Sequence, residues 1–301
     1  MPLLSRWPGA LDRLSRQSAS GPRPVGLLAC AGRFPILFAE KAREAGIPVV
    51  CVGVSGMADP ALASICTEFH WLRRASLGFL IRTFRRAGVG QWTMAGKFHK
   101  HLIFRPWRWL QFMPDWRMVR FFFFRNRRAN NDDSLSLGLI AEFNAHGLEC
   151  VSPLDLVPEL LVREGVLTRR RPTAAEDRDV AVGWALAREM GRLDVGQSVM
   201  IRERAVLAVE AIEGTDRAIE RAGELCGGAG FVVVKVAKPE QDRRFDVPTV
   251  GTQTIETMRR AGARVLAIEA GSTILLDEAE TVALADRYGI AITSVRTPPE
   301  V

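Results

Sequence analysis

Short apolar runs alternate with longer amphipathic segments along most of the chain, and this alternation predicts an α/β protein. In the first half, the apolar run Val25–Cys30 precedes a glycine-containing turn, a helical pattern to about Ala45 and a second apolar run at Val49–Val54. A strand, a helix and a strand at this spacing form a βαβ unit, which implies a parallel sheet. Further helices are expected over residues 77–87 and 134–146, and a further strand over 91–94.

The alternation starts again after Thr168–Thr173, a charged stretch that contains a proline and marks a boundary between two domains. A helix is expected from Ala174 to Met190, and two β-rich runs follow around the polar turn Glu203–Arg204. Strands and helices then alternate, which predicts a second α/β layer structure. The expected strands cover 199–202, 205–212, 231–236, 263–268 and 290–294, and the expected helices cover 215–224, 252–261 and 278–288.

Three parts are therefore predicted. They are a basic N-terminal extension (1–24), a Rossmann-like domain with a parallel sheet (25–167) and a mixed α/β domain (168–301), with a ligand cleft between the two domains. The length of 301 residues exceeds the size at which a single core usually stops growing, which agrees with two domains. With 48% hydrophobic and 25% charged residues, the composition excludes a disordered or collagen-like chain.

Cysteine and histidine usage argues against a zinc site or a disulfide framework. The five cysteines form no CxxC pair, and the four histidines do not combine with them at zinc-ligand spacing. Four of the five cysteines lie in apolar runs, as free thiols do in a reducing compartment. Neither a secretory signal nor a membrane-spanning run is recognisable. We therefore expect a cytoplasmic protein.

Positive charge is concentrated between Lys97 and Arg128, where nine lysines and arginines accompany the single acid Asp115. Tryptophans and phenylalanines alternate with these cations. Nucleic acid, a phosphate-bearing ligand or an anionic bilayer surface would each match this composition. At helical spacing, residues 108–125 place an aromatic stripe beside arginines, a pattern typical either of a membrane surface or of ordinary core packing with a solvated rim.

The densest polar cluster, Lys235–Gly251, follows the expected strand 231–236, and open α/β sheets bind ligands beyond the carboxyl ends of their strands. The chemistry of the cluster suits a phosphoanhydride. Asp242 and Asp246 are suited to holding Mg²⁺ or orienting a water. Three cations are suited to binding phosphate oxygens, namely Lys235, Lys238 and Arg244. The alternative interpretation is a solvated loop with internal ion pairs.

Other strand ends offer two further candidate sites. Glu213, Thr215 and Asp216 lie where a strand ends and a helix begins, so they either bind a metal or phosphate or simply cap the helix. In the first half, Gly32 and the pair Gly96–Lys97 each follow a strand and would bring backbone amides and a cation to a phosphate. Turns of βαβ units also use glycine for steric reasons alone.

Four motifs of the second half occur in a specific order and spacing. They are Leu193–Ser198, Ala208–Asp216, Lys235–Gly251 and Ala267–Gly271. In the first half, Gly26–Ala29, Gly32 with Pro35, and Met94–Lys97 continue the pattern. With these motifs the chain resembles the LpxI family, the UDP-2,3-diacylglucosamine pyrophosphatases of lipid A biosynthesis, from about Val25 to Ser294.

The resemblance implies a two-domain, Mg²⁺-dependent enzyme that uses water to split UDP-2,3-diacylglucosamine into UMP and 2,3-diacylglucosamine 1-phosphate. It places the family's essential aspartate at Asp242 or Asp246 without deciding between them. The expected substrate-binding residues are Gly32, Gly96, Lys97, Thr215, Lys235, Lys238, Gln241 and Arg244. The expected metal ligands are Glu213, Asp216, Asp242 and Asp246.

Two rival functions belong to other classes. A nucleic-acid-binding protein has no use for these four acids, which would repel phosphates without a metal, so nucleic acid is not an expected partner. A non-catalytic nucleotide-sugar or lipid-binding protein of the same fold would use the same residues. The expected partners are UDP-2,3-diacylglucosamine, the inner face of the cytoplasmic membrane, contacted peripherally by His99–Arg128, and a second copy of the chain.

Overall fold

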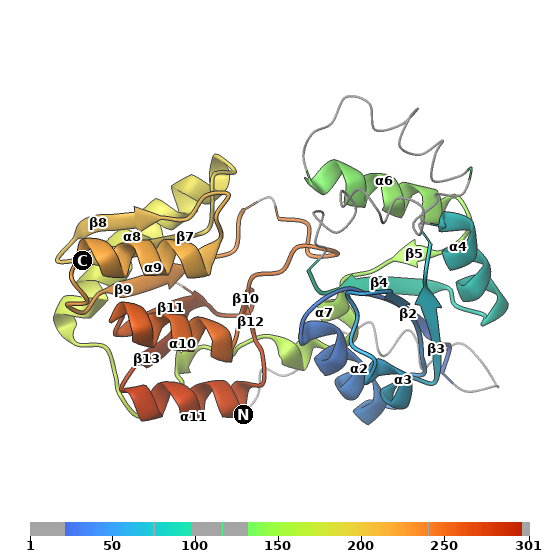
Figure 1. Ribbon diagram of the computed structural model, residues 1–301, viewed down its shortest axis with the longest axis horizontal. Coiled ribbons are helices and arrows are strands. Elements are labelled where there is room, and N and C mark those ends of the chain that lie inside the picture. Colours follow the sequence, from blue (N-terminus) through green and yellow to red (C-terminus); the bar gives the residue numbers. More distant parts are fainter. Residues whose placement is uncertain (1–21, 75, 98–115, 117–131, 240, 297–301) are drawn as a thin grey trace, which may run out of the picture. The chain divides into compact units, whose positions relative to one another are not determined.

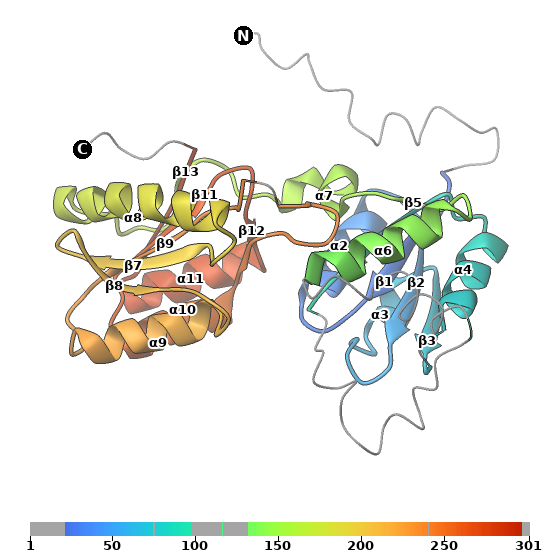
Figure 2. The same ribbon diagram turned by 90° about the horizontal axis from the view of Figure 1, so that it is seen from above.

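The computed structural model describes residues 22–74, 76–97, 116, 132–239 and 241–296. Residue contacts divide the chain into two compact units (Figure 1, Figure 2). Unit 1 comprises Met1–Pro158 and Arg243–Phe245, and unit 2 comprises Glu159–Asp242 and Asp246–Val301. Both units are α/β structures, as the apolar pattern predicts.

The division between the units differs from the sequence-based boundary. Residues 159–167 are predicted in the first domain, whereas they group with unit 2. The reason is that strand β6 (Gly165–Val166) pairs antiparallel with strand β13 (Ala291–Val295). Apart from Trp116, the basic aromatic segment His99–Arg128 lies outside the described residues, as does most of the N-terminal extension.

Unit 1 contains a five-stranded parallel sheet of order β3-β2-β1-β4-β5, which confirms the predicted Rossmann-like arrangement. Helices α2 and α3 lie on one face of the sheet and α4 and α6 on the other (Figure 1). The strands are β1 (Val25–Ala29), β2 (Val49–Val54), β3 (Glu68–Leu72), β4 (Gln91–Ala95) and β5 (Glu149–Cys150). The helices are α2 (Phe34–Glu44), α3 (Leu62–Ile65), α4 (Leu77–Arg86), α6 (Asp132–Asn144) and α7 (Pro153–Leu156).

Aromatic packing holds α4 and α6 against the sheet of unit 1. The Trp92 ring on β4 is fully buried, and its centroid lies 4.2 Å from that of Phe143 on α6. Phe84 on α4 meets Phe143 edge-on at 6.2 Å. On the neighbouring strand, a Cβ added at Gly26 would lie 3.0 Å from both the Phe84 and Trp92 side chains. The glycine therefore leaves room for these rings, and their burial fixes both helices.

Unit 2 contains a six-stranded mixed sheet of order β6-β13-β11-β9-β7-β8, in which β9, β11 and β13 run parallel. A two-stranded parallel sheet pairs β10 with β12. The remaining strands are β7 (Ser198–Arg202), β8 (Ala205–Val209), β9 (Val232–Lys235), β10 (Thr249–Val250), β11 (Val265–Glu269) and β12 (Ile274–Leu275). The helices are α8 (Ala174–Arg192), α9 (Thr215–Leu225), α10 (Thr252–Ala261) and α11 (Glu278–Tyr288).

The helices of unit 2 cover both faces of its sheet, with α8 on one face and α9, α10 and α11 on the other (Figure 2). Helix α8 begins with a capping box, in which the Thr173 side chain and the Glu176 side chain each bond the other's backbone N–H. Gly183 lets α8 approach closely, because a Cβ there would lie 2.7 Å from the Val234 side chain. Among the described residues, no helix is long and apolar enough to cross a membrane.

Asp179 on α8 supports the tight turn between β7 and β8. Glu203 (φ 50°) and Arg204 (φ 65°) both have left-handed backbone there, which residues other than glycine and asparagine rarely adopt. The buried Asp179 carboxylate accepts hydrogen bonds from the backbone nitrogens of Glu203 at 2.9 Å and Arg204 at 2.7 Å. The carboxylate therefore offsets the conformational cost of the turn.

We expect Asp179→Ala to lower the free energy of unfolding by about 3 kcal/mol, because two hydrogen bonds to a charged acceptor are lost. Arg204→Gly is the matched control, and it should raise the same quantity by up to about 1 kcal/mol because glycine adopts positive φ freely. Urea denaturation of the two variants measures both changes. Equal stability of Asp179→Ala and the original protein would show that the turn does not depend on this carboxylate.

Candidate functional site

A buried chain of polar side chains lies at the carboxyl edge of the unit 2 sheet. Lys235, the last residue of β9, donates from Nζ to the hydroxyl of Thr215 at 2.9 Å. That hydroxyl donates in turn to Oε1 of Glu210 at 2.9 Å. Lys235 and Glu210 are only 7% and 8% exposed. Two opposite charges, linked through one hydroxyl, are thus held away from water, where electrostatic interactions are strong.

The Glu210 carboxylate can accept a further hydrogen bond. Among the described residues, its Oε2 atom is buried and has no hydrogen-bond partner. The backbone around it is fixed, because Glu210 donates its N–H to Ser198 at 2.9 Å and its carbonyl approaches Gly196 closely. A Cβ added at Gly196 would lie 2.0 Å from the Glu210 carbonyl oxygen, so only glycine fits there. Sequence reasoning places Glu210 at the start of a candidate segment but does not include it among the predicted site residues.

Glu269, the last residue of β11, anchors the start of the loop after β9. Its Oε2 accepts the backbone N–H of Ala237 at 2.8 Å, and its Oε1 accepts from the Arg188 guanidinium of α8 at 2.9 Å. Glu269 is only 9% exposed, and both of its carboxylate oxygens accept hydrogen bonds. Sequence reasoning missed this function, since Arg188 lies 81 positions away. Glu269 on β11 therefore fixes the direction in which the loop after β9 leaves the sheet.

The first part of the loop is ordered by its own polar groups. Lys238 donates its backbone N–H to Oε1 of Gln241 at 3.1 Å and its Nζ to Asp194 at 2.6 Å. Gln241 Nε2 is buried and has no hydrogen-bond partner among the described residues. Helix α8 approaches through Gly191, where a Cβ would lie 3.3 Å from the Pro239 side chain. The structure thus brings together two of the predicted substrate-binding residues, Lys238 and Gln241.

The chain leaves unit 2 after Asp242 and returns at Asp246. Between them, Arg243–Phe245 groups with unit 1, where the Ser152 hydroxyl donates to the Arg243 carbonyl at 2.9 Å and Phe245 packs against the core. Asp246 donates its backbone N–H to the carbonyl of Asp242 at 3.0 Å, so the two aspartates are one turn of backbone apart. The predicted ligand Arg244 therefore belongs to unit 1, and the two aspartates flank it.

The four acids predicted as metal ligands do not form one cluster. Glu213 is paired with Arg221 at 2.6 Å, and Asp216 accepts from Thr254 at 3.2 Å and Gln253 at 3.3 Å. The backbone amide of Glu213 itself and the Arg221 guanidinium hold the pKa of the Glu213 carboxyl below its usual range. Across the part of the chain that the structure describes, no three acidic, histidine or cysteine side chains converge as a metal site.

In unit 1, the predicted residues Gly32, Gly96 and Lys97 lie together beyond β1 and β4. Ala31 and Lys97 exchange two backbone hydrogen bonds, at 3.1 and 2.8 Å. Gly96 (φ +94°) is required by this contact, because a Cβ would lie 2.6 Å from the Ala31 carbonyl oxygen. The order β3-β2-β1-β4-β5 reverses its direction of growth between β1 and β4. Open α/β sheets bind their ligands at this switch point, so the two glycines lie where the fold offers a site.

Comparison with known proteins identifies relatives for both units. The family model of the LpxI C-terminal domain matches residues 163–293, and that of the LpxI N-terminal domain matches residues 24–160. A curated protein of Caulobacter vibrioides, UDP-2,3-diacylglucosamine pyrophosphatase LpxI, is 30% identical over 281 residues. The alignment covers 91% of this chain and 98% of that protein. The two matched regions meet between residues 160 and 163, close to the division between the units.

Proposed function

The chain belongs to the LpxI family, and from this premise we propose that it hydrolyses UDP-2,3-diacylglucosamine to UMP and 2,3-diacylglucosamine 1-phosphate. The observation that carries the proposal is the arrangement at the carboxyl end of β9. There, the buried Lys235 and the neighbouring Lys238 precede Asp242 and Asp246 on one short loop. Cations for a pyrophosphate and carboxylates for its hydrolysis are thus supplied from a single segment.

Lys235 is suited to binding a phosphoryl oxygen because its position is fixed. The Thr215 hydroxyl bonds one of its N–H groups, and burial keeps the ammonium in surroundings where its field is weakly screened. Lys238 lies three residues further along, has a partly exposed side chain and is paired with the exposed Asp194. We propose that a substrate phosphate replaces Asp194 as the partner of Lys238, since exposed ion pairs are weak.

We propose that Asp242 and Asp246 hold Mg²⁺. Magnesium in phosphoryl-transfer enzymes is commonly bound by one or two carboxylates together with oxygens of the substrate, rather than by a cage of protein ligands. Two aspartates one turn of backbone apart on the loop after β9 fit that requirement. The bound ion would neutralise charge on the pyrophosphate and lower the pKa of a bound water.

Chelation of the metal should test this assignment directly. We expect UMP release from UDP-2,3-diacylglucosamine in detergent micelles to fall at least about 100-fold in EDTA, because the charge that the ion neutralises contributes several kcal/mol. Excess Mg²⁺ should restore the rate. Unchanged turnover in EDTA would remove the metal from the proposal. No UMP release under any condition, with substrate binding intact, would instead identify a non-catalytic binding protein.

The acyl chains of the proposed substrate require access to a membrane. We therefore propose that the protein acts peripherally at the inner face of the cytoplasmic membrane. A polar headgroup attached to two acyl chains remains in the bilayer, so the enzyme must approach that surface to reach it. Positively charged protein surfaces favour such an approach because the cytoplasmic leaflet is anionic.

A further inference from the structure

Helix α4 of unit 1 carries three exposed arginines, Arg82, Arg85 and Arg86. Leu77, Leu80, Ile81 and Phe84 are buried against the sheet and α6. The arginine side chains therefore extend from a helix whose position is fixed by its apolar face.

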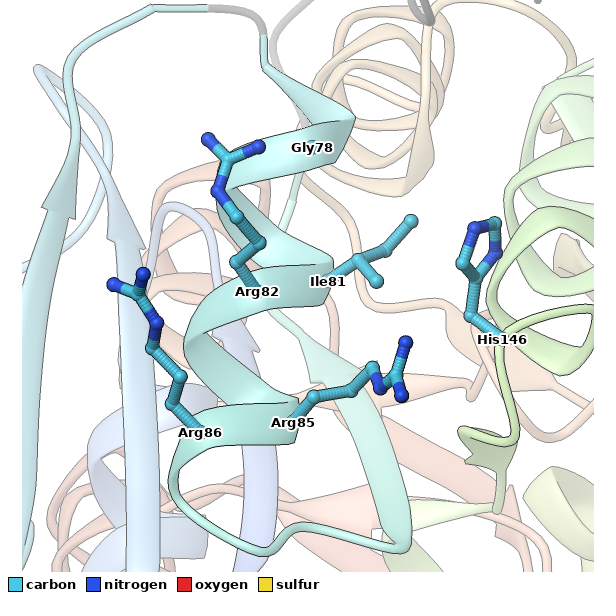
Figure 3. A pocket seen from close by; sticks show the side chains of 6 residues that line it. All are labelled: Gly78, Ile81, Arg82, Arg85, Arg86 and His146. Carbon is cyan, nitrogen blue, oxygen red and sulfur yellow. The ribbon is translucent and has the colours of Figure 1, made fainter.

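A pocket of about 390 Å³ lies between α4 and the turn after α6. Arg85 and Ile81 extend toward His146, while Arg82 and Arg86 extend from the other side of the helix (Figure 3). The pocket is lined by Gly78, Ile81, Arg82, Arg85, Arg86 and His146. We call this region the α4 surface. It combines three guanidinium groups with the side chains of Ile81 and His146.

The described residues do not neutralise the positive charge of these three arginines. Across the described residues, no acidic side chain pairs with Arg82, Arg85 or Arg86, whereas Arg170, Arg188 and several other arginines of unit 2 each pair with a glutamate. The sequence explains the difference. Residues 69–114 contain nine lysines and arginines and no aspartate or glutamate.

Like charges three and four positions apart destabilise a helix slightly, and Arg82 has this spacing to both Arg85 and Arg86. The last two arginines lie in the final turn, where the helix dipole favours them, but Arg82 lies outside it. An external anion would relieve this repulsion. Phosphate is the anion that fits best, because the planar guanidinium fork matches two of its oxygens.

We propose that the α4 surface binds the phosphate groups of anionic phospholipids and so docks the protein on a bilayer. The choice of lipid over other phosphates rests on the proposed function, whose substrate is embedded in a membrane. It also rests on the lack of exposed aromatic rings on α4. Single-stranded nucleic acid is bound by exposed aromatic rings as well as cations, but on α4 the Phe84 ring is buried and Phe79 is half-buried.

Co-sedimentation of the full-length protein with vesicles tests the proposal. The vesicles contain phosphatidylcholine alone or phosphatidylcholine with phosphatidylglycerol. We expect binding only to the second kind, weakened by salt. The triple variant Arg82→Gln/Arg85→Gln/Arg86→Gln should bind about 100-fold more weakly, because each cation near an anionic surface contributes about 1 kcal/mol, or roughly fivefold.

The matched control is Arg171→Gln/Arg178→Gln/Arg287→Gln, which removes the same charge from exposed arginines of unit 2. We expect it to bind within about threefold of the original protein. A third variant, with lysine at the three α4 positions, should keep most of the binding because it keeps the charge. Equal binding by the glutamine triple and the control would overturn the proposal, as would loss of binding in the lysine triple.

Two further measurements separate the alternatives. If the glutamine triple loses affinity for a fluorescent oligonucleotide but keeps its vesicle binding, the surface serves nucleic acid and the proposal fails. UMP release in detergent micelles should be the same for the glutamine triple and the original protein, while release from substrate in anionic vesicles should fall. No UMP release by the original protein in micelles would refute the proposed function alone, because vesicle binding is measured independently.

Discussion

Turnover is expected to fall about 1000-fold in Asp242→Asn, in Asp246→Asn or in both, with the melting temperature unchanged. Asparagine has the same size as aspartate but no charge, so the variants lose the carboxylate that would bind Mg²⁺ or orient the attacking water. That contribution is made chiefly in the transition state and amounts to several kcal/mol. The KM for UDP-2,3-diacylglucosamine should change less than kcat, because Lys235 and Lys238 would still contact the pyrophosphate in these variants.

UMP release under single-turnover conditions measures this effect, with Asp177→Asn on α8 as the control. Asp177 is a partly buried acid of the same unit, remote in sequence from the loop, and its replacement should leave the rate within about twofold. Near-normal turnover in both loop variants would exclude this loop as the catalytic segment. A loss confined to one variant would decide which aspartate is essential.

Lys235→Met is expected to have the second largest effect, because it removes one end of a buried charged chain. Glu210 would keep its buried carboxylate and lose the ammonium that faces it through Thr215. Leaving such a charge uncompensated costs about 3–5 kcal/mol of unfolding free energy. Turnover should also fall, with KM raised and kcat lowered, since the lysine would contact charge present before and during the reaction.

A double-mutant cycle separates the two effects of Lys235. In Lys235→Met/Glu210→Gln, no buried charge remains without its partner, so urea denaturation should show that much of the lost stability returns. Turnover should not return. Lys238→Met is the matched control, and because its ion pair with Asp194 is partly exposed it should cost less than about 1 kcal/mol. Additive losses in the cycle would contradict the coupling of Lys235 and Glu210 through Thr215.

The fold could be predicted largely from apolar runs separated by glycine and proline. The two large sheets, and the helices that connect their long strands, follow this pattern because each buried strand is a continuous apolar segment. Strand β3 was missed because it lies at the edge of its sheet and is mostly half-exposed, so Glu68–Leu72 lacks a continuous apolar run. The two-residue strands were missed because they are too short for any periodicity.

The sequence predicted which candidate site residues lie at strand ends. It did not predict which residues far apart in the sequence these side chains contact. Lys235 and Lys238 follow an apolar strand, which marks their location in the sequence. The contact of Lys235 with Thr215 joins residues 20 positions apart across an intervening helix, and no local pattern specifies it. The metal prediction counted Glu213 as a free acid, whereas Arg221 binds it from two turns along α9. Such an ion pair joins residues eight positions apart, so the residues next to Glu213 in the sequence do not reveal it.

The excursion of Arg243–Phe245 into unit 1 also affects the order in which the protein can fold during synthesis. Ser152 and Arg243, which share a hydrogen bond, are 91 positions apart. At about 5–20 residues per second, a ribosome adds Arg243 roughly 5–20 s after Ser152. Unit 1 therefore waits for its last contacts until most of unit 2 has been made. A nascent chain that stops at Pro158 lacks Phe245, so it would leave part of its core uncovered and exposed to proteases and chaperones.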